Sequence, residues 1–203
     1  MSMIVRLAAL YLLLKLRRRR TQRRRRKWVH RQHRQLGEYH RLFDELRLDE
    51  SRFQRYTRLT VAQYDDLLSR VAHHISRQDT NYRLAISAGE RLAIFLRYMA
   101  TGDSYRSIAN SFRVGVSTVS NIVPQVAAAI WECLAGEFMA VPNTEGWRSN
   151  AVDFEQWRIF RRTMEMRPEI VELCVKASRV LDNYIRKSTP ETAEIPNATA
   201  NVA

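Results

Sequence analysis

The sequence predicts an all-α fold, and three observations support this prediction. Glycine and proline are scarce, at 6 and 5 of 203 residues. Residues that favour helices, such as Leu, Ala, Arg and Glu, are abundant. Apolar residues recur at helical spacing, whereas the alternation typical of strands is hard to find. A chain of this length can form one domain with a substantial core and still carry tails.

The distribution of charge separates an N-terminal tail from the rest of the chain. Of 34 Lys and Arg residues, 13 lie in residues 1–36, which hold no Asp or Glu; the other 21 are balanced by 21 Asp and Glu. The net charge of +13 therefore belongs to the tail. We expect four regions: a basic tail with a short apolar helix (1–36), a helical domain (37–135), a connector with a C-terminal helical segment (136–187) and a disordered tail (188–203).

The tail combines an apolar run with a basic block. The run at 7–14 is too short to span a bilayer. Most of the positive charge follows the run, whereas in a signal peptide the positive charge precedes it. We therefore expect no membrane span, but a helix that docks on the domain or touches a membrane surface. The basic block consists of Arg17, Arg18, Arg19, Arg20, Arg23, Arg24, Arg25, Arg26 and Lys27. It indicates a nucleic-acid arm and a nuclear localisation signal, with a membrane-proximal patch as the alternative.

Helix signals follow in order from residue 38. Residues 38–48 are amphipathic, Asp49 is placed to cap a short helix, and Thr60 to cap a helix over 61–75. After a polar connector, Ser87 and Glu90 form the capping-box pattern S-x-x-E. The helix that they open, 88–100, is apolar on most sides and is expected to be the central buried helix, with Gly102 as its stop.

Residues 104–126 predict a helix-turn-helix. A short helix (104–112) is followed by the turn Arg113-Val114-Gly115, where Gly115 suits a tight connection, and by a longer helix from Val116. The expected inward residues are Ile108, Ala109 and Phe112, then Val116, Val119, Ile122, Val123 and Val126. Pro124 predicts a kink or break near Val123.

This unit provides the candidate DNA-binding residues. Ser117, Thr118, Ser120 and Asn121 are expected to point outward at the start of the second helix, where a recognition helix meets base edges. Arg106 and Arg113 flank them, and no acid lies between residues 104 and 126 to repel phosphates. The alternative is an ordinary helical hairpin inside an all-α domain.

No catalytic or metal site is predicted from the residues. The acidic pairs Asp44/Glu45, Asp49/Glu50, Asp65/Asp66 and Glu165/Glu169 lie beside Arg residues with no strand to arrange them, so we interpret them as solvated helix faces. The adjacent His73 and His74 lack further ligands at helical spacing. Cys133 and Cys174 lie in apolar helical patterns and do not form a disulfide framework.

Three stretches resemble PIF/Harbinger-type transposase-derived nucleases. The resemblance to that family's N-terminal region lies in RLDESRFQRYTRLTVAQYDDLL, ISAGERLAIFLRYMATGDSYRSIANSFRVGVSTVSNIVPQV and AAIWECL. The resemblance to its C-terminal end lies in QWRIFRRTMEM and PEIVELCVKASRVLDNYIRK. The match covers most of residues 28–187, and its most specific part is ATGDSYRSIANSFRVGVSTVS. The resemblance implies a helix-turn-helix region, an RNase H-like nuclease domain with three catalytic acids, and a divalent metal.

The chain departs from the family where the nuclease core should begin. Residues 154–157 run directly into Arg158, in sequence that resembles the segment after the third catalytic acid. No residue matches any of the three acids, so we expect no catalytic residues, no cofactor and no enzymatic activity. Asp182 stands where relatives usually have His. We also expect 151–187 to be loosely attached, with Val171, Cys174, Val175 and Leu181 partly exposed and able to support self-association through 169–187.

Three functions follow as hypotheses. The first is a DNA-binding, non-catalytic relative of these nucleases, located in the nucleus and also in the cytoplasm. The second is a metal-dependent nuclease, as the family resemblance alone implies. The third is a protein-interaction module, because the resemblance implies a Myb-like DNA-binding partner. A membrane partner is the less favoured alternative.

Overall fold

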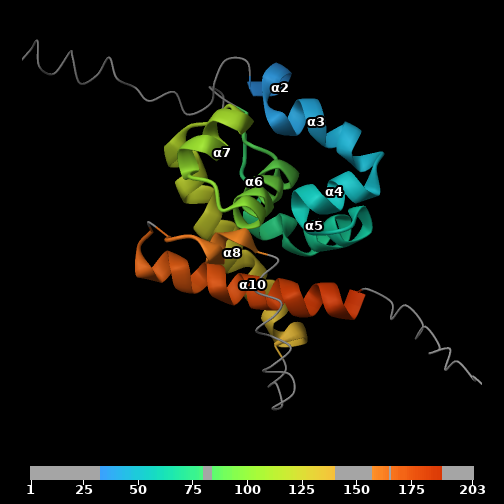
Figure 1. Cartoon of the computed structure of the whole chain (residues 1–203), viewed down its shortest axis with the longest axis vertical. Coiled ribbons are helices and arrows are strands. Elements are labelled where there is room, and N and C mark those ends of the chain that lie inside the picture. The colour runs from blue at the N-terminus through green and yellow to red at the C-terminus, as the bar shows by residue number, and fades with distance from the viewer. Residues whose placement is uncertain (1–32, 80–83, 140–156, 165, 189–203) are drawn as a thin grey trace, which may run out of the picture.

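The protein is described here from a computed structural model, which places residues 33–79, 84–139, 157–164 and 166–188 (Figure 1). Every regular element in these residues is a helix, which confirms the predicted all-α class. The elements are α2 (His33–Leu36), α3 (Glu38–Arg47), α4 (Glu50–Thr57), α5 (Val61–Ile75), α6 (Ala88–Thr101), α7 (Tyr105–Phe112), α8 (Val116–Phe138), the 3-10 turn η2 (Arg158–Arg161) and α10 (Pro168–Ser188). The basic block, the apolar run at 7–14 and the tail at 189–203 lie outside the described residues. No helix among those described is long and apolar enough to cross a membrane.

The predicted caps of the first helices are confirmed. The Asp49 side chain accepts a hydrogen bond from the Arg52 amide at the start of α4. At the start of α5, Thr60 and Gln63 form a complete capping box. Behind these caps, aromatic residues of three helices pack together, with ring centroids 5.1–5.6 Å apart among Phe43, Phe53 and Tyr64. Local sequence therefore sets the helix ends, and aromatic burial joins the helices.

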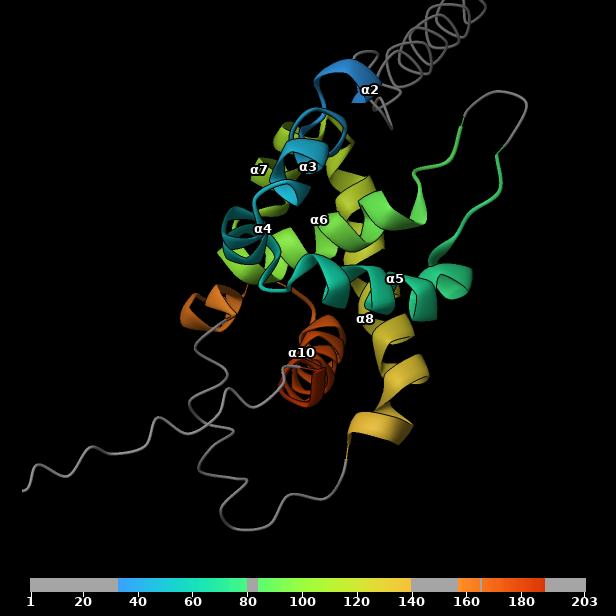
Figure 2. The same cartoon turned by 90° about the vertical axis from the view of Figure 1, so that its right-hand side faces the viewer.

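Helix α6 is the central helix, as predicted. Residues 92–96 are completely buried, and α4, α5, α7, α8 and η2 all pack against the helix (Figure 2). Gly102 ends it with φ of 65°, a left-handed conformation that favours glycine. A Cβ atom on Gly102 would come within 3.1 Å of the Arg158 carbonyl, so η2 also needs a glycine here.

Helix α8 is longer than expected. It continues through Pro124 and Gly136, so the helix does not break near Val123, the second of the two outcomes predicted there, and the predicted connector does not begin at residue 136. Proline has no amide hydrogen, so the Ser120 carbonyl loses its helical partner. Burial of Ile122, Val123 and Val126 on both sides of the proline stabilises the helix despite this loss.

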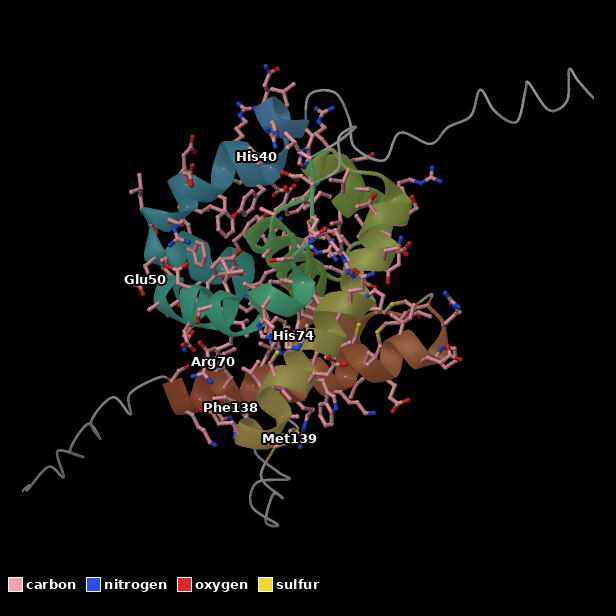
Figure 3. The ribbon with its side chains drawn as sticks, turned by 180° about the vertical axis from the view of Figure 1, so that it is seen from behind. His40, Glu50, Arg70, His74, Phe138 and Met139 are labelled. Atoms are coloured by element: carbon pink, nitrogen blue, oxygen red, sulfur yellow. The ribbon has the colours of Figure 1, made fainter. Side chains whose placement is uncertain are left out.

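The C-terminal helix is firmly attached, which corrects the prediction of a loose segment. Helix α10 packs across α8 (Figures 1 and 2), and its residues Cys174, Val180 and Leu181 are completely buried. The Asn183 side-chain amide donates to the Phe138 carbonyl at 2.8 Å, near the end of α8 that Figure 3 labels. Of the four residues expected to be partly exposed, Cys174 and Leu181 are buried, whereas Val171 and Val175 are half-buried, so the face on which the predicted self-association depended is covered only in part.

The turn η2 ties the same region to α6. Within the predicted region 136–187, residues 140–156 lie outside the described residues, and 158–161 form η2. Trp157, just before it, is completely buried and donates its indole N–H to Asp182 Oδ1 at 2.6 Å.

Candidate nucleic-acid interface

Helices α7 and α8 form a two-helix unit supported by α6. Ile108, Ala109 and Phe112 are buried on the inner face of α7, and Val119 and Ile122 are buried on α8. Ser104 caps α7 by accepting a hydrogen bond from the Ser107 amide. Both helices pack their apolar faces against α6 and against each other, and this packing fixes the position of α7 relative to α8.

The turn between them uses a different residue from the one predicted. Arg113 has the left-handed conformation, with φ of 57°, whereas Gly115 has an ordinary extended φ of −73°. The Arg113 and Val114 amides donate to the carbonyls of Asn110 and Ala109, at 3.3 and 3.0 Å. This hydrogen-bond pair is a Schellman motif, which requires a left-handed residue directly after the helix. The prediction that Gly115 supplies the unusual backbone angle was therefore wrong.

Four of the six candidate DNA-binding residues lie exposed on this unit: Arg106, Arg113, Ser117 and Asn121. Ser120 is half-buried, and its hydroxyl donates to the Ser117 carbonyl at 3.0 Å. Thr118 is only 3% exposed, which corrects its predicted outward position. Thr118 lies four residues before Ile122 and therefore shares its inward face.

The first residue of α8 also differs from prediction. Val116 was expected to point inward but is 45% exposed. It lies at the first position of the helix, before the buried face begins at Thr118. An exposed apolar side chain therefore lies among the polar candidates, where it could contact a thymine methyl group.

The exposed side of the unit is cationic. No acidic residue occurs from Ser104 to Val126. The nearest acid, Asp103, lies 3.8 Å from the Arg162 guanidinium. Its negative charge is partly offset by this arginine, so a phosphate backbone would meet little repulsion at the start of α7.

A cavity of about 420 Å³ borders the N-terminal end of α7. Arg106 lines one part of it, while Tyr98 and Tyr105 direct their hydroxyls to the Met166 sulfur at 3.4 and 3.1 Å. Burial raises the pKa of Tyr105 to about 12, so this phenol is neutral at physiological pH. Two cationic side chains, Arg106 and Arg162, and the Asp103 carboxylate therefore line the cavity beside neutral tyrosines and apolar methionines.

The acidic pairs behave as ordinary surface groups where the structure describes them. Asp65 forms a two-pronged ion pair with Arg47, and Asp66 pairs with Arg70 at 2.9 Å. Glu165 lies outside the described residues. These pairs do not meet in one place, so the described part of the chain offers no carboxylate cluster for the divalent metal that the resemblance implies.

One cluster of potential ligands, formed by His33, His40 and Glu90, was not predicted from the sequence. The capping box predicted at α6 is only half formed: Ser87 accepts from the Glu90 amide, but the Glu90 carboxylate turns to His33 Nε2 at 2.6 Å. Burial, followed by the negative charge of Glu90, raises the pKa of the nearby Tyr39 phenol. Glu90 lies 57 residues from His33 in the chain, so no local spacing could have indicated this cluster.

His73 and His74 are exposed near the end of α5, as expected. The rings of His73 and His74 lie 3.8 Å apart, and His74 Nδ1 lies 3.1 Å from Cys133 Sγ (Figure 3). Both cysteines are free, and burial raises the pKa of the Cys174 thiol to about 12.

Comparison with known proteins gives no match. No protein-family model matches the chain, and no curated protein or solved structure matches it. The resemblance to PIF/Harbinger-type nucleases therefore stays a prediction from the residues.

Proposed function

We propose that this protein is a DNA-binding, non-catalytic relative of PIF/Harbinger-type transposase-derived nucleases that acts in the nucleus. One observation carries the proposal: the exposed side of α7 and α8 presents Arg106, Arg113, Ser117 and Asn121, with no acid between residues 104 and 126. Arginines can pair with phosphates, while Ser and Asn at the start of a helix can reach base edges. The buried side of the same helices holds this surface rigid.

The basic block supplies the second part of the proposal. Nine Lys and Arg residues between 17 and 27 provide non-specific attraction to DNA and a nuclear import signal. The exposed residues of α8 then provide the sequence preference, because phosphate contacts position a protein without specifying bases.

The experiment separates these two parts in the full-length chain. All nine basic residues are replaced by Gln, which preserves residues 33–36 and their contacts with α6. We call this protein the tail-neutral variant. We expect it to retain measurable binding to duplex DNA, and binding should weaken further when Arg106→Gln and Arg113→Gln are added. If it binds no duplex at any salt concentration, α7 and α8 do not contact DNA, and docking of a protein partner becomes the better account.

The proposed lack of nuclease activity is tested by a separate experiment. Purified protein is incubated with supercoiled plasmid and Mg²⁺ or Mn²⁺. We expect no nicking above background, because no described carboxylates cluster to hold catalytic ions. Cleavage that depends on metal and copurifies with the protein would favour the nuclease instead.

A further inference from the structure

Glu90 is a buried carboxylate that lies between two imidazoles. Its Oε1 is 2.6 Å from His33 Nε2, and its Oε2 is 3.5 Å from His40 Nε2. The side chains of Glu90, His33 and His40 are 1%, 8% and 30% exposed. One donor atom from each residue lies within 4.8 Å of the other two. We propose that His33, His40 and Glu90 bind a divalent transition-metal ion, and that Zn²⁺ is the occupant.

The donor set selects the kind of metal. Two imidazole nitrogens and one carboxylate oxygen form a common zinc ligand set, with bonds of about 2.0–2.2 Å. Such bonds place tetrahedral ligand atoms about 3.4 Å apart. The distance from His40 Nε2 to Glu90 Oε2 is already near this separation, and the distance from His33 Nε2 to Glu90 Oε1 reaches it by opening less than about 1 Å. Because these are different oxygens, the carboxylate would also turn to present one of them to the ion. Mg²⁺ prefers oxygen ligands and water, so this site differs in kind from a nuclease metal site.

The residues around Glu90 are consistent with an ion-binding site. Among the described residues, Glu90 forms ion pairs with these two histidines and with no Lys or Arg. Gly89 lies next to it, and a Cβ atom there would lie 2.6 Å from the Tyr39 hydroxyl, so the tyrosine side chain lies close against the start of α6. His40 lies on α3 (Figure 3), and its side chain is 30% exposed, so an ion and water as a fourth ligand could reach the cluster from this side.

The ion would cross-link segments that are distant in the sequence. His33 belongs to α2, His40 to α3 and Glu90 to the first turn of α6. The joint between α2 and α3 also lies against α7, since a Cβ atom on Gly37 would come within 3.0 Å of the Phe112 carbonyl. Because His33 follows the basic block by six residues, the ion would fix where that block joins the domain.

The test uses the full-length chain after treatment with a chelator. We expect calorimetric titration with Zn²⁺ to give one site per chain, and Zn²⁺ to raise the temperature of thermal unfolding because a ligand of the folded state stabilises it. His40→Ala should weaken binding at least about tenfold. The double variant His73→Ala/His74→Ala is the matched control and should bind as the unaltered chain does. Mg²⁺ should not compete.

Three results would overturn the site. Absence of Zn²⁺ binding would leave a simple buried ion pair between His33 and Glu90. Equal binding by His40→Ala would place the ion elsewhere, and loss of binding in the control would place it at the exposed histidines near Cys133. Glu90→Gln should also lose binding, but His40 is partly exposed, so its variant carries the test even where Glu90→Gln does not fold.

Discussion

The indole N–H of Trp157 donates to Oδ1 of Asp182 at 2.6 Å, and both side chains are almost completely buried. This hydrogen bond joins the segment before η2 to the middle of α10, across 25 residues of chain. It explains in part why the C-terminal segment is docked rather than loose. A buried indole N–H without an acceptor is costly, so the two residues depend on each other.

Removing this acceptor should therefore destabilise the protein. We expect Asp182→Ala to lower the free energy of unfolding by about 1–3 kcal/mol, because the Trp157 N–H would lose its partner. Asp182→Asn keeps a side-chain oxygen at the same position and should cost less. Urea unfolding followed by circular dichroism gives both values. Equal midpoints for Asp182→Ala and the unaltered chain would show that the hydrogen bond contributes nothing.

The buried thiol of Cys174 predicts a dependence of stability on alkaline pH. Burial raises the pKa of this thiol from 9.0 to about 12, so the folded state keeps the proton that the unfolded state loses. Its contribution is fully present below pH 9.0 and is lost as the pH rises toward about 12. Unfolding free energies measured from pH 8 to pH 10.5 should fall less steeply in Cys174→Ala, by up to about 1.4 kcal/mol per pH unit. Identical slopes would contradict the raised pKa.

Arg113 combines a backbone role with the proposed DNA contact, and Arg113→Asn separates them. Asn tolerates the left-handed conformation, so we expect the free energy of unfolding to change by less than about 0.5 kcal/mol. In the tail-neutral variant, the same substitution should weaken duplex binding and make the salt slope less steep by about 1, as expected for one lost phosphate contact.

Arg55→Gln is the matched control for the loss of one charge, since Arg55 is exposed on α4. It should leave DNA binding unchanged. Equal weakening by both variants would mean that net charge, rather than the position of Arg113, governs binding.

The basic block should dominate the salt dependence of binding. If about seven phosphates are neutralised, the logarithm of affinity falls against the logarithm of salt with a slope near −6. The tail-neutral variant should show a much shallower slope, and its affinity should fall for all sequences alike. It should also move from nucleus to cytoplasm. Nuclear localisation that persists in the variant would remove the import role, and stronger binding to anionic vesicles than to DNA would favour a membrane surface.

Local features of the fold were predictable from the sequence, whereas contacts between distant segments were not. Asp49, Thr60 and Gly102 act as caps or stops through neighbours within four residues, and each was identified correctly. The partner of Glu90 and the docking of α10 depend on segments far along the chain. Periodicity alone cannot supply such contacts, because it gives the face of a helix but not what covers it.

Within the candidate interface, too, sequence predicted some positions correctly and misplaced those that depend on packing or on backbone hydrogen bonds. Residue type and position correctly predicted exposure of Ser117 and Asn121. Thr118 was misplaced because it is polar but shares the inward face with Ile122. At the turn, glycine content indicated Gly115, whereas the hydrogen bonds require the left-handed residue directly after α7, which is Arg113.

Selection from a random duplex library by the tail-neutral variant tests most directly whether α8 recognises DNA sequence. We predict that bound duplexes share a short motif, and that Ser117→Ala/Asn121→Ala abolishes or changes this motif while the fold is retained. Loss of the Asn121 contact should cost about 1–3 kcal/mol of discrimination at one base pair. Lack of enrichment, or the same motif from both proteins, would contradict recognition by the N-terminal turn of α8.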